Sequence, residues 1–438
     1  MAAASQVRRL QRDVEIVVLE KGNWASYSAC GIPYLVGGTV SWLKDLVART
    51  PEEFRAMRID LRLHHEAVAL DLEARTVEVH NIERGRTFTM GFDQLHLATG
   101  ALPRRPHVPG IELPHVFGVQ TLTDAEAILA AVEQAPRRVC VIGGGYVGLE
   151  LAEAFLIRGA EVTVVDRAAQ PMGTLDPDMG ALVAAAMRKM GITVRTEEGV
   201  LGIEKGAVHA EHGDIPADVV ILGTGVRPNT DMLAVAGVPL GESGAVAVDR
   251  RQRTSIEGVF AAGDCCESVH LVSGAKVNVA LGTHANKQGR VAGINLAGGY
   301  ATFPGVMGTA VTKICANEIG RTGCNEAEAI AAGFEYVTAT IDATTGSQYM
   351  GDAVAPIRVK MLAERGNGRV LGAQIVGGPG SAKRIDVVAT ALSARMTLED
   401  VISLDLGYAP PLSSVWDPVA AAARAALGAL RPGPGASR

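Results

Sequence analysis

A glycine-rich loop between an apolar strand and a helix constrains this chain more than any other sequence feature. Residues 138–142 (RVCVI) have the apolar character of a buried parallel strand, and GGGYVG at 143–148 follows them with the spacing G-x-G-x-x-G. The next apolar run, 161–166 (EVTVVD), ends in Asp166. Such glycines allow a tight turn and the close approach of a pyrophosphate, which the helix N-terminus binds through its free N–H groups. The pattern predicts a dinucleotide-binding unit.

The loop glycines and the acid after the second strand are the candidate contacts to this dinucleotide. A carboxylate at Asp166 can accept hydrogen bonds from the adenine ribose hydroxyls, which favours NADH over NADPH. Arg167, the next residue, could instead pair with a 2′-phosphate. A purely structural glycine turn is the alternative interpretation. The candidate contacts are Gly143, Gly145, Gly148 and Asp166.

A second strand of the same kind lies near the N-terminus. Residues 14–20 (VEIVVLE) are expected to form a buried parallel strand that ends in Glu20, as the other strand ends in Asp166. With the same spacing, the matching glycine loop would fall before Met1, so Met1 would lie inside the helix that follows such a loop. We therefore expect a nucleotide-binding unit that is incomplete at its N-terminus, through a wrongly assigned or truncated start. An ordinary strand is the alternative.

Two later segments fit the same second nucleotide. LATG at 97–100 follows an expected strand with small residues that suit the close approach of a ligand. VFAAGD at 259–264 is an apolar strand that ends in Gly-Asp, where a carboxylate can hold a polyol hydroxyl. Each segment alone could equally be a buried structural turn. The candidate contacts to this nucleotide are Glu20, Thr99, Gly100, Gly263 and Asp264.

Length and composition limit the classes of protein that fit. The 438 residues correspond to about three domains, and apolar strands that alternate with helical stretches predict a doubly wound α/β fold. Antiparallel strands are expected at 73–80, at 85–97 and over much of 335–376, with a helical segment at 381–395. The net charge of −6 argues against a nucleic-acid-binding protein. No apolar run could span a membrane, no secretory signal is found, and the six cysteines show no paired framework, which fits a cytoplasmic compartment.

Four motifs, taken in order, carry a resemblance to a known family. GGGYVG, ILGTGVRPN at 221–229, GVFAAGD at 258–264 and LATG resemble the pyridine nucleotide–disulfide oxidoreductases over nearly the whole chain. The resemblance implies two Rossmann-like domains, which bind FAD and NAD(P), an α+β dimerisation domain, and a homodimer. It adds Val68 and Gly225 to the cofactor contacts. The implied boundaries are 1–119 with 236–305 for the FAD-binding domain, 120–235 for the NAD(P)-binding domain and 306–430 for the dimerisation domain, followed by a disordered tail at 431–438.

The segment around Cys30 resembles the single-cysteine branch of this family. SYSACGIPY at 26–34 is most similar to the CoA-disulfide reductases, and the branch also contains persulfide reductases and NADH oxidases. No second cysteine lies four or five residues away, so the redox partner of Cys30 is a small-molecule thiol or oxygen. Pro33 suits an early helical position, so the helix dipole is expected to favour the reactive thiolate at Cys30. The alternative is a small buried apolar residue.

The resemblance also implies which residues meet the substrate and the partner subunit. Tyr408 matches a tyrosine that reaches across the dimer to the partner's cysteine, where its phenol could protonate the leaving thiolate. A packing tyrosine before a Pro-Pro turn is the alternative, and Tyr349 is a candidate for a second phenol. Two positions depart from the family and weaken the case for CoA: Ala29 replaces a frequent Asn, and Trp416 a frequent Lys. The implied CoA contacts are Gln6, Arg9, Ser26, Arg58 and His284.

These features together predict an enzyme. It is expected to be an FAD-dependent NAD(P)H oxidoreductase that reduces CoA disulfide, or a similar low-molecular-weight disulfide or persulfide, through Cys30 with help from Tyr408. One alternative is an NADH oxidase that reduces oxygen, with Cys30 as a sulfenic acid. Another is a flavin-free or non-enzymatic redox partner. No metal site is expected, because the pair His64-His65 is interpreted as part of a solvated face.

Overall fold

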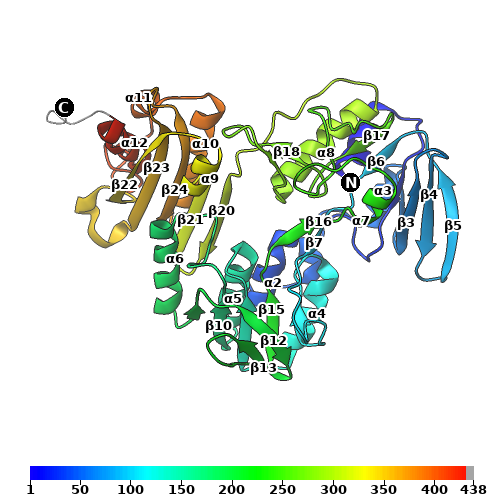
Figure 1. The fold of residues 1–438 in the computed structure, drawn as a ribbon, viewed down its shortest axis with the longest axis horizontal. Coiled ribbons are helices and arrows are strands. Elements are labelled where there is room, and N and C mark those ends of the chain that lie inside the picture. The colour runs from blue at the N-terminus through cyan, green and yellow to red at the C-terminus, as the bar shows by residue number, and fades with distance from the viewer. Residues whose placement is uncertain (431–438) are drawn as a thin grey trace.

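A computed structural model describes residues 1–430, whose elements form three groups (Figure 1). The first group combines the N-terminal part of the chain with a segment that returns after the second group, and the third group is C-terminal. This arrangement confirms the predicted α/β fold with two nucleotide-binding units and a C-terminal α+β unit. The predicted disordered tail, 431–438, lies outside the described residues.

The second group is built around a five-stranded parallel sheet, as the glycine loop predicts. The strand order is β11-β10-β9-β15-β8, and every neighbouring pair is parallel. Strand β9 (Arg138–Ile142) is almost wholly buried, which explains its apolar sequence, and it leads through the loop into α5 (Tyr146–Ile157). The other elements are β8 (Val116–Phe117), α4 (Leu122–Glu133), β10 (Glu161–Val165), α6 (Pro177–Lys189), β11 (Thr193–Arg195), β12 (Val200–Glu204), β13 (Gly206–Ala210), β14 (Ile215–Ala217) and β15 (Val219–Leu222).

The first group contains two separate pairs of parallel strands. Strand β1 (Val17–Leu19) pairs with β2 (Asp60–Arg62), and β6 (Leu95–Leu97) pairs with β17 (Val259–Ala261). The prediction of a buried strand over 14–20 is wrong in extent and burial. Only three of its residues form β1, and all three are half-buried because β1 has a neighbouring strand on one side only among the described residues.

Two helices and an antiparallel sheet complete the first group. Helix α1 (Ala2–Leu10) packs along α8 (Gly282–Leu296), where a Cβ on Gly293 would come within 2.6 Å of the Ala3 carbonyl oxygen. The predicted antiparallel ribbon ends at Gly91, because β6 belongs to a parallel pair. The other elements are α3 (Pro51–Ala56), β3 (His65–Asp71), β4 (Thr76–Asn81), β5 (Arg86–Gly91), β7 (Ala101–Pro103), β16 (Val226–Pro228), α7 (Asp231–Val235), β18 (Ser268–Val269) and β19 (Lys276–Val277). Helix α2 (Ile32–Gly37) also comes from the N-terminal part of the chain, but it lies against α5 of the second group (Figure 1).

The third group is an antiparallel sheet covered by helices. Its strand order is β20-β21-β24-β23-β22, which confirms the antiparallel strands predicted over much of 335–376. The helical segment predicted at 381–395 forms a 3₁₀ turn followed by α10. The elements are β20 (Ala310–Ile314), β21 (Asn317–Gly323), α9 (Glu326–Ala331), β22 (Tyr336–Thr344), β23 (Pro356–Glu364), β24 (Val370–Gly377), α10 (Ile385–Ser393), α11 (Leu398–Ile402) and α12 (Pro418–Leu430).

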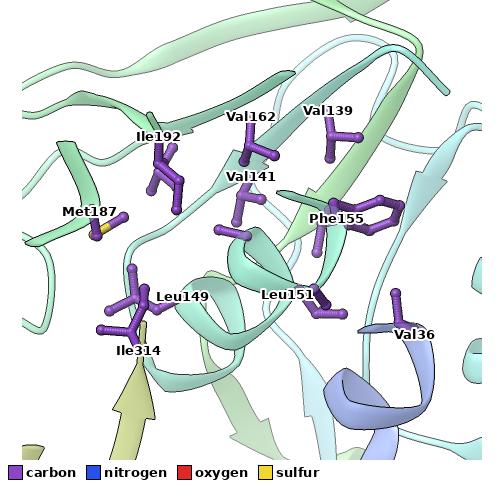
Figure 2. Packing of buried hydrophobic residues seen from close by; sticks show 14 of the residues in the cluster. Val36, Val139, Val141, Leu149, Leu151, Phe155, Val162, Met187, Ile192 and Ile314 are labelled. Carbon is purple, nitrogen blue, oxygen red and sulfur yellow. The ribbon is translucent and has the colours of Figure 1, made fainter. Parts of the chain in front are cut away.

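The largest hydrophobic core joins all three groups. Figure 2 shows Phe155 and Leu151 of α5 packed with strands of the parallel sheet, and Val36 of α2 and Ile314 of β20 belong to the same cluster. Burying such side chains contributes roughly 1.5–3 kcal/mol each. Helix α2 and the end of β20 are therefore held firmly against the helix that follows the glycine loop.

Two further findings limit the kinds of site that this fold offers. Among residues 1–430, no helix combines the length and apolarity that crossing a membrane requires. The same residues contain no group of three or more His, Cys, Asp or Glu side chains that could hold a metal ion.

Candidate functional site

The glycine loop lies at the carboxyl edge of the parallel sheet, between β9 and α5. Gly143 has φ = +102°, and a Cβ there would come within 2.6 Å of the Gly223 carbonyl oxygen. A Cβ on Gly148 would come within 2.1 Å of the Gly143 carbonyl oxygen. Gly145 is the N-cap of α5, whose first N–H groups are free to bind an anion. The loop can therefore take this shape only with glycines at positions 143 and 148.

Asp166 fixes the loop from the neighbouring strand. Its Oδ2 accepts a hydrogen bond from the Gly144 N–H at 2.6 Å, and its Oδ1 accepts one from the Ala168 N–H at 2.9 Å. Each carboxylate oxygen keeps a second lone pair for a ribose hydroxyl. Gly225, with φ = +80°, has no atom within 4 Å of the position a Cβ would take, which leaves space for a ligand. This edge of the sheet can bind a dinucleotide through backbone groups and one carboxylate.

Cys30 lies in a 3₁₀ turn, Ala29–Gly31, that leads directly into α2. Helix α2 packs on α5 so closely that a Cβ on Gly37 would lie 3.4 Å from the Cα of Ala154. Cys30 is exposed, and all six cysteines are free thiols. Packing of α2 thus brings one accessible sulfur beside the helix that begins at the glycine loop.

The electrostatic surroundings of Cys30 differ from the prediction. Desolvation by the neighbouring chain raises the pKa of the Cys30 thiol, and the charges of Glu150 and Asp264 raise it further, while a backbone hydrogen bond only partly opposes them. Helix α2 begins at Ile32, so its positive end lies near the sulfur, but the helix has only six residues. The net effect of the described residues opposes the thiolate, contrary to the expectation that Cys30 favours it.

Glu150 is a site residue that the sequence interpretation missed. It lies on α5 two residues after Gly148, and its Oε1 accepts a hydrogen bond from Thr312 Oγ1 at 2.6 Å. Burial raises the pKa of Glu150, and the bond from Thr312 opposes this. Because Thr312 belongs to β20, the third group reaches the surroundings of Cys30. The motif GGGYVGLE contains this glutamate, but no local signal places it near the cysteine.

The segments predicted to hold FAD meet at the ends of β6 and β17. Gly100 has φ = +70°, and nothing lies within 4 Å of the position a Cβ would take. Gly263 also has a positive φ, of +85°, and leads into Asp264. Burial raises the pKa of the Asp264 carboxyl, and a half-buried carboxyl suits a polyol hydroxyl. The Thr99 hydroxyl is already engaged, because it donates to the Asn229 carbonyl oxygen at 2.6 Å.

The remaining predicted FAD contacts are spread along the first group. Glu20 follows β1, and its Oε1 accepts a hydrogen bond from the Gly22 N–H at 2.7 Å. Val68 lies on β3 with 41% of its surface exposed. Within this sequence no glycine loop precedes α1. The residues present therefore fit the ribityl and ribose parts of FAD, and they include no loop for its pyrophosphate.

The predicted substrate contacts on α1 lie next to Arg58. Gln6 and Arg9 are both on α1, and Arg8 Nη2 donates a hydrogen bond to the Arg58 carbonyl oxygen at 2.7 Å. The Arg58 guanidinium donates in turn to the Arg12 carbonyl oxygen at 2.9 Å. The end of α1 is thus a basic surface, although the Arg58 guanidinium already donates one hydrogen bond to a backbone carbonyl oxygen.

Ser26 and His284 lie in two other segments of the first group. The Ser26 carbonyl oxygen accepts from the Ala48 N–H at 2.9 Å. Arg49, which the sequence interpretation missed, connects this segment to α1, because its Nη1 lies 3.3 Å from the Ser5 hydroxyl. His284 lies in the first turn of α8; burial lowers its pKa, and a backbone hydrogen bond with Val279 partly opposes this. Arg49 thus joins the predicted Arg9 and Arg58 as a third arginine, and the predicted His284 is neutral at pH 7.

Tyr408 and Tyr349 come together in the third group. The Tyr408 phenol interacts with the side chains of Tyr349 and Ser347; the interaction with Tyr349 is the main cause of its raised pKa, and the interaction with Ser347 partly opposes it. Tyr408 is 50% exposed and Tyr349 74% exposed. The nearby Trp416 is also exposed and stacks on Arg424, whose guanidinium carbon lies 4.1 Å from the ring centroid. The third group therefore presents two adjacent phenols on its surface.

Known proteins match this chain over almost its whole length. The family model described as pyridine nucleotide-disulphide oxidoreductase matches residues 1–289, and the model of the dimerisation domain matches residues 309–420. An NAD(P)H sulfur oxidoreductase (CoA-dependent) from Pyrococcus furiosus is 37% identical over 430 residues, 97% of this chain and 96% of the relative. An NADH oxidase from Methanocaldococcus jannaschii is 36% identical over 434 residues, 98% of this chain and 96% of the relative. The solved structure of an NAD-dependent persulfide reductase from A. fulgidus has a TM-score of 0.94 at 37% identity and covers 98% of this chain and 81% of that one.

Proposed function

Because this chain belongs to the pyridine nucleotide-disulfide oxidoreductase family, we propose that it uses NAD(P)H and bound FAD to reduce CoA disulfide, or a similar low-molecular-weight disulfide or persulfide. The observation that carries the proposal is the position of Cys30. Its exposed thiol lies under the electrostatic influence of Glu150, on the helix of the glycine loop, and of Asp264, on the segment that fits FAD. One reactive sulfur between two nucleotide sites suits electron transfer from a dinucleotide to sulfur.

Cys30 carries the sulfur chemistry in this proposal. Its thiolate attacks one sulfur of the disulfide R–S–S–R, forms Cys30–S–S–R and releases RS⁻, which takes up a proton. Two electrons from NAD(P)H then convert the mixed disulfide into the Cys30 thiolate and a second thiol. Bound FAD would supply the relay of that electron pair from the nicotinamide to the sulfur. Each turnover consumes one NAD(P)H, one proton and one disulfide, and releases two thiols.

We propose that the chain works as a homodimer in which Tyr408 of the partner subunit serves Cys30. The match to a dimerisation domain and the exposure of the Tyr408–Tyr349 pair support this arrangement. Its raised pKa keeps the Tyr408 phenol protonated at neutral pH, so that it can donate a proton to the departing thiolate. The exposed Leu412 and Val415 near it provide apolar surface that a second chain would cover.

The basic end of α1 supports a thiol that carries phosphate groups, as CoA does. Guanidinium groups bind phosphate through charge and forked donors, and Arg9, Arg49 and Arg58 are the candidates. An indole at Trp416 could stack on an adenine in place of a lysine contact. The free state of all six cysteines supports the predicted cytoplasmic location.

Acceptor specificity gives the direct test of this proposal. In anaerobic assays the flavin-loaded protein should oxidise NADH with CoA disulfide at least about tenfold faster than it consumes oxygen in a separate assay without disulfide. A sample without any acceptor is the control. If neither CoA disulfide nor oxygen supports the oxidation of NADH, the proposal is overturned.

An NADH oxidase is the second candidate function, and the relative from M. jannaschii with that name supports it. In the same pair of assays an oxidase would consume oxygen quickly and turn over CoA disulfide slowly. That result would also give weight to Ala29 and Trp416, the two positions that differ from the CoA-disulfide reductase pattern.

Asp166 should decide the choice between NADH and NADPH. We expect Asp166→Ala to lower kcat/KM for NADH about tenfold more than kcat/KM for NADPH, because a hydrogen bond from a ribose hydroxyl to a charged acceptor contributes roughly 1.5–3 kcal/mol. Asp218→Ala is the matched control: Asp218 pairs with Arg138 in the same domain, away from the loop. Equal losses with both nucleotides would leave Asp166 only the structural role of holding Gly144.

A further inference from the structure

Arg384 joins the two loops that carry the tyrosine pair. It lies at the start of α10, and its Nη2 donates to the Thr345 carbonyl oxygen at 2.8 Å and also to the Leu412 carbonyl oxygen. Thr345 comes shortly before Tyr349, and Leu412 shortly after Tyr408. One guanidinium therefore binds both loops at once.

The same guanidinium is itself held in place. Its Nη1 donates to the Gly380 carbonyl oxygen at 2.6 Å, and its Nε donates to Asp417 Oδ2 at 3.2 Å. The Arg384 and Asp417 side chains are only 12% and 13% exposed. Asp417 Oδ2 also accepts a hydrogen bond from the Ser413 hydroxyl at 3.1 Å, so the loop after Tyr408 is tied down a second time.

Direct contacts between the two loops leave little room for them to shift. The Ser347 N–H donates to the Pro410 carbonyl oxygen at 2.7 Å, and a Cβ on Gly346 would come within 2.6 Å of the same oxygen. The Ser347 side chain also interacts with the Tyr408 phenol, as described above. The relative placement of the two loops is thus set by one compact set of polar contacts, with Arg384 at its centre.

We propose that Arg384 is a positioning residue for disulfide reduction. By joining these two loops, it sets how Tyr349 and Tyr408 are placed relative to each other where they meet the cysteine of a partner subunit. The inference deepens the proposed function and rests on it. Arginine is suited to this task because its planar guanidinium offers five N–H donors in a fixed fork, whereas lysine offers one compact point charge. The neighbouring Lys383 is 74% exposed, and within residues 1–430 its ion pair is with Asp386 alone, so it supplies a matched control.

A double-mutant cycle tests whether Arg384 acts through the phenols. We expect Arg384→Gln to lower kcat for disulfide reduction about 10- to 100-fold, since small displacements of a catalytic group have effects of this size, with little change in KM for NADH. In a Tyr408→Phe background the same change should cost no more than about twofold. Arg384→Lys should recover part of the activity, and Lys383→Gln should match the unmodified chain. Additive losses, or no loss from Arg384→Gln, would overturn the proposal.

A spectroscopic titration gives a readout that does not depend on activity. Contact with Tyr349 raises the pKa of Tyr408, so separating the loops should let Tyr408 ionise at lower pH. The absorbance change of phenolate formation, assigned with Tyr408→Phe, should shift to lower pH in Arg384→Gln and Arg384→Lys and stay in place in Lys383→Gln. An unshifted titration in both Arg384 variants would reject the inference that Arg384 holds the two tyrosine loops together. Unchanged turnover in Tyr408→Phe would instead reject the role of Tyr408 in the proposed function, while a shifted titration would still support that inference about Arg384.

Discussion

Replacing Cys30 by serine should abolish disulfide turnover and leave the reaction with NAD(P)H largely intact. The serine hydroxyl cannot form the mixed disulfide, so we expect kcat for disulfide reduction to fall on the order of 10³-fold or more. The glycine loop and Asp166 lie in another domain, and their contacts do not involve Cys30. Anaerobic addition of NADH to flavin-loaded protein should therefore still bleach the flavin absorbance at a rate within about threefold of the unmodified chain.

A second thiol provides the control for this result. Cys315 is partly buried and free, and Cys315→Ser should keep turnover within about twofold. Because the pKa of Cys30 is raised, its thiolate fraction grows as pH rises, so alkylation of Cys30 should accelerate from pH 6 to about pH 9. Unchanged disulfide turnover in Cys30→Ser would remove the cysteine from the mechanism. An alkylation rate that levels off well below about pH 9 would contradict the raised pKa.

The glycine loop could be predicted because its constraints are local. The strand, the turn and the helix are contiguous, and the steric limit at Gly148 comes from Gly143 in the same loop, whereas the limit at Gly143 comes from Gly223, just after the neighbouring strand β15. The third domain could be predicted in outline for the same reason, since its antiparallel strands follow one another along the chain.

The surroundings of Cys30 could not be predicted because they are made by distant segments. Thr312 and Glu150 are 162 residues apart, and only the packing of α2 on α5 brings Glu150 close to the sulfur. The sequence argument considered a favourable helix dipole and had no means to include this carboxylate. It therefore gave the wrong sign for the pKa shift of Cys30.

Strand β1, which pairs with β2, is a case in which the sequence predicted more burial than the structure shows. The apolar run at 14–20 predicts a buried strand, yet burial depends on neighbours on both sides, and among the described residues β1 pairs only with β2.

By contrast, the tyrosine pair shows what an approximate pattern can still find. The motif left the register of Tyr349 open, and the structure brings Tyr349 close enough to Tyr408 to raise its pKa.

Among the side chains that connect the second and third domains, Lys360 should contribute most to the free energy of unfolding. Its Nζ lies 2.7 Å from Glu326 Oε1, 2.8 Å from Asp178 Oδ1 and 3.1 Å from Asp176 Oδ2. The Lys360 and Asp176 side chains are 6% and 3% exposed. Asp176 is the N-cap of α6 and also accepts a hydrogen bond from Gln374 at 2.7 Å. The cluster thus ties the start of α6 to the sheet of the third domain.

We expect Lys360→Met to lower the free energy of unfolding by about 3–5 kcal/mol, because it leaves Asp176 buried without its cation. Burial lowers the pKa of Lys360, but hydrogen bonds to Asp178 and Glu326 and the charge of Asp176 outweigh it and raise the pKa. The contribution of Lys360 is therefore complete at neutral pH and is lost only as pH rises through its raised folded-state pKa. Arg358→Met, two residues along β23, removes an ion pair with the exposed Asp342 and should cost no more than about 1 kcal/mol. Urea unfolding at pH 7 should separate the two variants clearly. Equal losses would mean that water reaches the cluster and that the domains are joined mainly by their shared apolar core.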